Sequence, residues 1–318
     1  GLVLFGQGSK SLGTIVAISS YASYFWQPIM NLGNIFNNFI NNIAYLERIF
    51  ETMDEPVTVK DAENAVKMPE IRGEVTFDHV NFSYDESKQI LKDVSFTVKP
   101  GESVALVGPT GAGKSTIVNL ISRFYNVNGG RVLIDGQDIS QVTIHSLREQ
   151  MGIMMQDSFI FSGDIEDNIR YGKLDATLEE IVNASKTVCA DEFISKMPDG
   201  YQTEVRERGS MLSQGQKQLI SFARTLLSDP AILILDEATS SIDVQTEKAL
   251  QTGLNAMLKG RTSFIIAHRL STIRNCDKIM YIDNGGIMES GTHDELMTKK
   301  GYYYKLYTAQ LDEVQKAG

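Results

Sequence analysis

The sequence has few cysteines and no excess of basic residues, and both deficits limit what the protein can be. Only two cysteines occur in 318 residues, Cys189 and Cys276, far apart and without a CxxC spacing. This argues against a disulfide framework and against a zinc site. The formal net charge is −10, whereas binding to the phosphates of nucleic acids requires a basic surface. With 42% hydrophobic and 22% charged residues, the composition is that of a folded globular chain.

The N-terminal region lacks charge. No charged side chain lies between Lys10 and Glu47, a run of 36 residues. A helix of that length reaches about 54 Å, more than the roughly 30 Å of a bilayer core. Its polar residues share one helical stripe and its apolar residues another. The polar stripe is Gln27, Asn31, Asn34, Asn38, Asn41 and Tyr45, and the apolar stripe is Ile29, Leu32, Phe36, Phe39, Ile43 and Leu46.

Two interpretations of this stretch compete. A soluble amphipathic helix or coiled coil normally carries Lys and Glu on its solvated face, and here that face has only amides and hydroxyls. We therefore favour a transmembrane helix at about 13–50, with its polar stripe toward other helices or a water-filled path. The chain starts without an initiator Met or the basic region of a signal peptide, which is expected of a fragment of a longer protein.

Beyond the uncharged stretch the pattern changes. Residues 57–72 are polar, and Pro69 precedes Gly73, which predicts a linker. From Gly73 onward, short β-rich runs alternate with helical patterns, which predicts parallel strands joined by crossover helices. The predicted strands are 75–82 (with an irregular step), 94–98, 103–107, 131–135, 231–235, 262–267 and 278–283.

A glycine-rich loop gives the sharpest chemical signal. It follows an apolar strand and opens a helix, with the sequence Gly108-Pro109-Thr110-Gly111-Ala112-Gly113-Lys114-Ser115. Glycines allow backbone N–H groups to turn toward phosphate oxygens, and the helix N-terminus adds partial positive charge. We expect Lys114 to reach the β- and γ-phosphates of a nucleotide and Ser115 to place its hydroxyl on Mg²⁺.

A second signal is an aliphatic strand that ends in two acidic residues. Residues 232–235 are Ile-Leu-Ile-Leu, and Asp236 and Glu237 follow them. Such a run is typical of a strand buried on both faces, and its carboxyl end points to the ligand crevice of an α/β sheet. We expect Asp236 to bind Mg²⁺ through water and Glu237 to polarise the attacking water.

A third segment identifies a family. Leu212-Ser213-Gln214-Gly215-Gln216 resembles the signature motif of the ABC ATPases, although Gln214 stands where glycine is commonest in that family. It lies between the phosphate loop and the Asp236-Glu237 strand, as the family requires. The resemblance covers the chain from about Gly73 to its end and implies an ATPase that works as a head-to-tail pair. In such a pair, the signature of one subunit closes over ATP held by the other.

The resemblance implies roles for further residues. Tyr84 matches the aromatic residue on the adenine ring, and Gln156 matches a glutamine that senses Mg²⁺. Asp243 matches a loop that contacts the partner's active site, and His268 matches a histidine on the γ-phosphate. The predicted catalytic residues are Glu237, His268, Gln156 and Lys114, and the predicted metal ligands are Ser115, Gln156 and Asp236. The predicted nucleotide contacts are Tyr84, Gly108, Pro109, Thr110, Gly111, Ala112, Gly113, Lys114, Ser115, Thr116, Ser213, Gly215, Gln216 and Asp243.

These expectations define a fold class and a domain order. The predicted fold is an α/β P-loop NTPase of ABC ATPase type, a mixed sheet core plus a helical subdomain, preceded by one long transmembrane helix. Residues 1–55 would end a permease domain, 56–72 form a linker and 73–318 form the nucleotide-binding domain, with its helical subdomain at about 157–229.

The implied function is ATP-driven export. The cofactors are ATP and Mg²⁺, and the partner is a second half-transporter, identical or different. The implied location is the cell membrane, as a multi-pass protein with its ATPase domain in the cytoplasm. The alternatives are a soluble ABC ATPase without a transport role, the ATPase subunit of an importer, and half of a heterodimer with one degenerate site.

Overall fold

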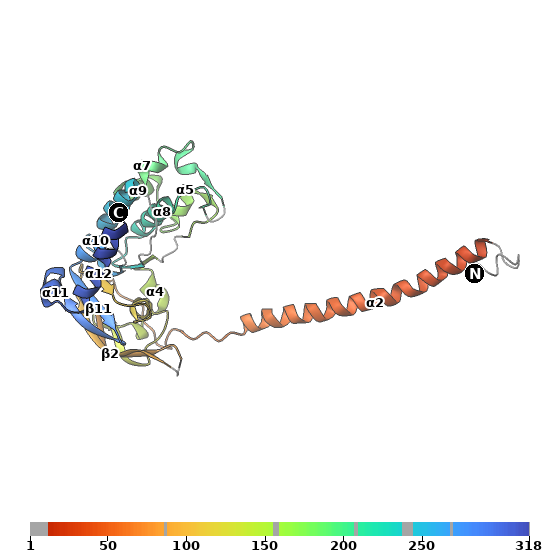
Figure 1. The fold of residues 1–318 in the computed structure, drawn as a ribbon, viewed down its shortest axis with the longest axis horizontal. Helices are drawn as coiled ribbons and strands as arrows, with labels where there is room; N and C mark the ends of the chain where they lie inside the picture. The colour runs from red at the N-terminus through yellow and green to blue at the C-terminus, as the bar shows by residue number, and fades with distance from the viewer. Residues whose placement is uncertain are drawn as a thin grey trace. The chain divides into compact units, whose positions relative to one another are not determined.

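The computed structural model describes residues 12–85, 88–154, 159–206, 209–236, 244–267 and 270–317. The chain divides into two compact units, with the boundary between Thr58 and Val59 (Figure 1).

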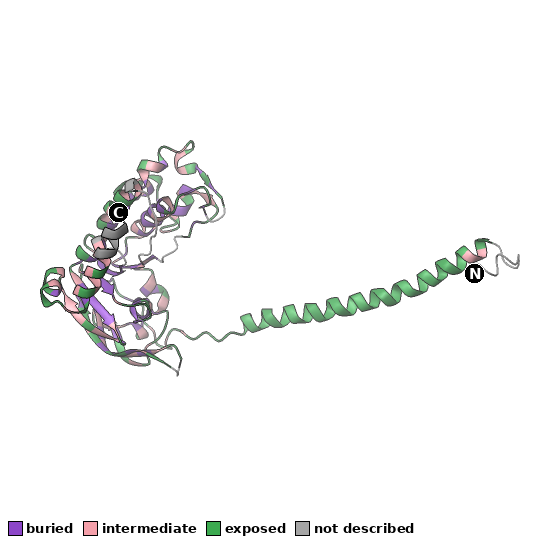
Figure 2. Ribbon diagram, viewed as in Figure 1, coloured by how far each residue is buried: buried purple, intermediate pink, exposed green. Residues whose placement is uncertain are grey.

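The first unit contains a single long helix. Helix α2 spans Leu12–Met53, 42 residues, and continues through Pro28. None of its residues is buried, and Figure 2 shows it exposed along nearly its whole length. The predicted N-terminal helix is therefore present, with its apolar stripe uncovered by the described chain. Across the described residues, no helix is both long enough and apolar enough to cross a membrane.

A six-stranded sheet forms the centre of the second unit. The pairs that join β11, β3, β10, β9 and β6 are all parallel, and β12 is antiparallel to β11 at one edge. The strands at its centre are fully buried, as the aliphatic runs of the sequence predicted. In spatial order the strands are β12 (Gly286–Gly291), β11 (Lys278–Asp283), β3 (Ser103–Val107), β10 (Thr262–Ile266), β9 (Ile232–Asp236) and β6 (Met151–Met154).

A second, antiparallel sheet has the order β2-β1-β4-β5. The irregular step predicted in the first strand is confirmed, because the pairing of β1 with β2 shifts between Phe77 and Val80. His79 lies in this step with φ 52°, a left-handed conformation typical of a bulge. The strands are β1 (Val75–Ser83), β2 (Gln89–Val98), β4 (Gly129–Ile134) and β5 (Gln137–Asp138), and a separate short pair is β7 (Gly163–Asp164) and β8 (Glu204–Val205).

Helices surround the sheets, with α5, α6, α7, α8 and α9 gathered in one part of the unit (Figure 1). Their amphipathic patterns bury one face each; α8, for example, buries Leu219, Ile220 and Phe222. The helices are α3 (Lys114–Ile121), α4 (Ile144–Arg148), α5 (Ile165–Arg170), α6 (Leu178–Thr187), α7 (Asp191–Ile194), α8 (Gln214–Leu227), α9 (Val244–Leu258), α10 (Leu270–Arg274), α11 (His293–Lys299) and α12 (Tyr302–Ala317), with short 3₁₀ turns η1 (Ile139–Gln141) and η2 (Gly200–Gln202).

The central sheet separates two hydrophobic cores. Successive side chains of a strand point to opposite faces, so Ile234 and Leu235 enter different cores. The core that contains Leu235 includes residues of α5, α6, α8 and α9. The core that contains Ile234 includes α3 and the antiparallel sheet. The central strands are thus shared by both halves of the unit.

The segment before β1 belongs to the second unit and is hydrogen-bonded to the rest of it. Met68 donates its backbone N–H to the Ser146 hydroxyl at 2.8 Å, and Ile71 donates to the Gln150 side chain at 2.9 Å. The buried Arg123 guanidinium donates to the carbonyls of Val142 and Lys60, at 2.5 and 3.0 Å. Residues 60–71 are therefore fixed to the rest of the second unit by hydrogen bonds that close loops of more than sixty residues.

Candidate nucleotide-binding site

The glycine-rich loop joins the buried strand β3 to helix α3. Gly108 has φ 139°, and a Cβ there would lie 2.1 Å from the backbone oxygen of Ile282 on β11. Gly113 caps α3 with φ 108°, and a Cβ there would lie 2.9 Å from the Leu91 side chain. Both positions favour glycine, because an L side chain is strained at these φ values, and at Gly108 a side chain would also meet backbone atoms. The sequence therefore folds here into a close turn that aims the N-terminus of α3 into a cavity.

Lys114, the first residue of α3, folds back over the loop. Its ammonium donates to the carbonyls of Gly108 and Pro109, at 2.8 and 2.9 Å. The residue is 9% exposed. Burial lowers the pKa of the Lys114 ammonium from its ordinary value, and the negative charge of Asp236 partly opposes this shift. A cation held in this desolvated position interacts more strongly with an incoming phosphate than an exposed lysine would.

A cavity of about 300 Å³ opens beside the loop. It brings together two residues that the sequence places far from the loop, namely Tyr84 after β1 and Asp236 at the end of β9. The cavity also includes Ile90 and Ile266, which the sequence did not single out, since nothing distinguishes them from core aliphatics. The lining residues are Tyr84, Ile90, Thr110, Gly111, Gly113, Lys114, Ser115, Thr116, Asp236 and Ile266.

Tyr84 is fixed to the start of α3. Its hydroxyl lies 3.2 Å from the Thr116 hydroxyl, and the Asn119 amide donates to it at 3.5 Å. The residue is 48% exposed, so about half of its surface is available to a ligand. An aromatic ring, a cation and a carboxylate thus line one cavity with a helix N-terminus, an arrangement suited to a base, a polyphosphate and a hydrated cation.

The predicted signature segment forms the start of another helix. Ser213 is the N-cap of α8, with its hydroxyl accepting from the Gln216 backbone N–H at 3.2 Å. The Gln216 side chain in turn accepts from the Ser213 N–H at 2.9 Å, which completes a capping box. Ser213, Gly215 and Gln216 are not among the residues that line the cavity described above. Within one chain, the two predicted parts of the site are therefore separate.

Four predicted residues lie outside the described residues. They are Gln156, Glu237, Asp243 and His268. Among the residues that are described, no group of three or more His, Cys, Asp or Glu side chains could hold a metal ion by itself. Mg²⁺ does not need such a group, because it is usually held by one or two carboxylates, water and the phosphates of the substrate. The Ser115 hydroxyl and the Asp236 carboxylate share the cavity and fit that requirement.

The buried strand, the glycine turn, the lysine and the helix that follows define a phosphate-loop nucleotide-binding domain. Residues 91–240 match the ABC transporter family. The chain is 51% identical over 310 residues to the uncharacterized ABC transporter ATP-binding protein YknV of Bacillus subtilis (strain 168), covering 98% of this chain and 51% of that protein. It is 44% identical over 302 residues to a fatty acid ABC transporter ATP-binding/permease protein of Mycobacterium bovis, covering 95% of this chain and 48% of that protein.

A solved structure agrees with these relatives. The structure of a bacterial Atm1-family ABC exporter with ATP bound superposes with a TM-score of 0.77 at 41% identity, over 96% of this chain and 54% of that one. The second unit of the chain contains a nucleotide-binding domain of the ABC transporter family, matched over residues 91–240. The chain spans about half the length of these relatives.

Proposed function

We propose that this chain is the ATP-hydrolysing part of an ABC exporter. The observation that carries the proposal is the cavity in which Tyr84, Lys114 and Asp236 meet around the glycine-rich loop. Similarity to an exporter solved with ATP bound and to ATP-binding/permease proteins supports it. The alternatives, an importer subunit and an ABC ATPase without a transport role, have no comparable support.

Each residue of the site takes one task in this proposal. Tyr84 stacks on adenine, while the loop N–H groups and Lys114 bind the phosphates. Ser115 and Asp236, together with Gln156, hold Mg²⁺, which would neutralise phosphate charge during hydrolysis. Glu237 orients the attacking water, and His268 contacts the γ-phosphate. Phosphoryl transfer to water depends mainly on such positioning and charge neutralisation.

A second subunit completes the site. Ser213, Gly215 and Gln216 do not line the cavity of their own chain, which supports their acting on a nucleotide held by a partner. The partner would be an identical or a related half-transporter, and Asp243 would contact its active site. Closure of the pair then assembles the catalytic site, so that hydrolysis follows association.

Helix α2 connects this domain to the membrane in our proposal. Residues 1–55 would end the permease domain and 56–72 the linker, with residues 73–318 forming the ATPase domain and about 157–229 its helical subdomain. The uncovered apolar stripe of α2 and the uncharged run from residue 11 to residue 46 support a position among other helices in the cell membrane. The ATPase domain would lie in the cytoplasm, where ATP is available.

A matched pair of variants tests the ATPase assignment. Glu237→Gln should retain ATP affinity and lose roughly three or more decades of hydrolysis, because only the water-orienting carboxylate is removed. Lys114→Ala should lose ATP affinity instead, because the phosphates lose the cation that binds them. Phosphate release and equilibrium ATP binding measured on both variants separate the two roles. Near-normal hydrolysis by Glu237→Gln, or full ATP affinity in Lys114→Ala, would contradict the assignment.

A further inference from the structure

The position of the Tyr84 ring is only partly determined by its own hydrogen bonds. Tyr84 comes directly after Ser83, the last residue of β1, and its hydroxyl is bound to Thr116 and Asn119. The hydroxyl oxygen and the Cβ atom of a tyrosine both lie on the long axis of the ring. Hydrogen bonds at the hydroxyl therefore fix the direction of this axis, but they leave rotation of the ring about it free. Contacts with neighbouring side chains must determine that rotation.

Two aromatic rings lie against Tyr84. The ring centroids of Phe82 and Tyr84 are 4.8 Å apart with an interplanar angle of 87°, and those of Tyr84 and Tyr125 are 4.9 Å apart at 85°. Near-perpendicular pairs at this distance are favourable, because the positive edge of one ring meets the negative face of the other. Phe82 is buried in the core, whereas Tyr125 is 41% exposed. Tyr125 is thus the neighbouring ring that is partly exposed to solvent.

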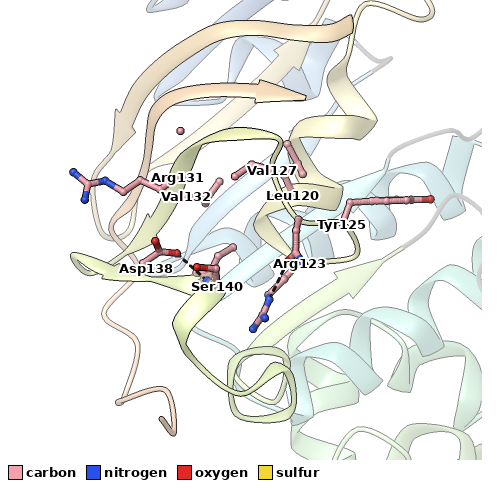
Figure 3. Close-up of a pocket in the computed structure, with 11 residues that line it drawn as sticks. Leu120, Arg123, Tyr125, Val127, Arg131, Val132, Asp138 and Ser140 are labelled. Atoms are coloured by element: carbon pink, nitrogen blue, oxygen red, sulfur yellow. Dashed lines mark hydrogen bonds between the residues drawn. The ribbon is translucent and has the colours of Figure 1, made fainter. Parts of the chain in front are cut away.

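Tyr125 itself lies in a turn whose preceding residues contact other parts of the unit. The turn follows α3, and the residues before Tyr125 are each anchored elsewhere in the unit. Arg123, 2% exposed, donates to the carbonyls of Val142 and Lys60, and the Arg148 guanidinium lies 4.6 Å from the centre of the Phe124 ring. Figure 3 shows the Tyr125 side chain extending from this turn away from Arg131. Its position is therefore set by the fold.

We propose that Tyr125 is a positioning residue for the nucleobase. It holds the Tyr84 ring in one orientation, and it thereby raises the affinity for the base without any effect on the phosphates. This inference rests on the proposed ATP-binding function and on the stacking of adenine against Tyr84. A ring that is already oriented needs no ordering when the base binds, and the gain expected from one perpendicular aromatic pair is about two- to tenfold in affinity.

The test compares a ligand that has a base with one that has none. Binding of Mg²⁺ with a non-hydrolysable ATP analogue, and of Mg²⁺ with inorganic tripolyphosphate, is measured calorimetrically on the full chain. Tyr125→Leu should weaken binding of the ATP analogue about two- to tenfold and leave tripolyphosphate binding unchanged. Tyr125→Phe keeps the ring and should bind both ligands like the unmodified chain. Tyr171→Leu, which removes an exposed tyrosine that contacts the Phe161 ring and does not line the cavity, is the matched control and should change neither affinity.

A double-mutant cycle tests whether Tyr125 acts through Tyr84. In a Tyr84→Leu background, Tyr125→Leu should cause no further loss of affinity for the ATP analogue. Equal weakening of both ligands by Tyr125→Leu, no weakening of either, or an undiminished effect in the Tyr84→Leu background would overturn the inference. Failure of the unmodified chain to bind tripolyphosphate or the ATP analogue would instead refute the proposed function, and this result is distinguishable from the others.

Discussion

Two glycines of the phosphate loop should respond very differently to the same substitution. Gly108 and Gly111 both have positive φ, 139° and 79°. A Cβ at Gly108 would meet the Ile282 backbone oxygen at 2.1 Å, whereas a Cβ at Gly111 would have nothing within 4 Å. Ile282 follows Tyr281, which pairs with Val107, the residue before Gly108. Relief of this contact therefore requires β3 and β11 to move apart.

The expected magnitudes follow from these two environments. Gly111→Ala only forces alanine into the left-handed region, at a cost of about 1–2 kcal/mol in the free energy of unfolding. Gly108→Ala adds the displacement of a packed backbone to a comparable conformational strain, so we expect a loss of about 3–5 kcal/mol. Urea denaturation of both variants, followed by circular dichroism, measures the difference directly.

ATP binding gives a second measurement on the same pair. Gly111→Ala should retain binding at a reduced level, because the loop keeps its contact with β11, while Gly108→Ala should lose most of it as the loop shifts. If the two variants were equally stable, the close approach of Gly108 to β11 would be refuted. The contact with the sheet would then not be what determines the shape of this loop.

Two further predictions concern buried cations. Burial lowers the pKa of Lys114 from its ordinary value of 10.5, so its ammonium loses the proton at a lower pH than an exposed lysine would. Affinity for tripolyphosphate should therefore fall as the pH rises toward 10.5. Lys114→Met should remove this pH dependence. Arg123→Met should lower the free energy of unfolding by about 1–3 kcal/mol, because the buried carbonyl of Val142 loses its donor and the hydrogen bond to Lys60 is lost with it. The exposed pair of Arg131 and Asp78 offers a control, since Arg131→Met should cost no more than about 1 kcal/mol; equal losses in the two variants would contradict the anchoring role of Arg123.

The sequence predicted the central strands well, because each is a short aliphatic run. The run 262–267 corresponds to β10 (Thr262–Ile266), and 278–283 matches β11 at both ends. The sequence did not reveal that β1 belongs to a separate antiparallel sheet, since a period of two does not specify a partner strand. It also missed β12, whose side chains are exposed or half-buried and show no alternation, and β7 and β8, which are two residues each.

The part of the site that is formed by consecutive residues could be predicted from the sequence. The glycine loop, Lys114 and Ser115 follow one another, so the motif alone fixes their order from strand to helix. The position of Tyr84 depends on a hydrogen bond to Thr116, 32 residues away, and only the resemblance to a family indicated it. The roles of Tyr125 and Arg123 arise from contacts between turns, and no residue pattern in the sequence signals them.

The central sheet has a consequence for how this protein can change during evolution or by design. Ile234 and Leu235 are neighbours in the chain, yet each supports a different half of the catalytic unit. Removal of the helical half, which consists of α5, α6, α8 and α9, would expose much of one face of these strands to water, so neither half is expected to fold as an independent module. Substitutions in these helices are therefore expected mainly on their outward surfaces and in their loops. The side chains that pack on the shared strands must keep their volume and shape.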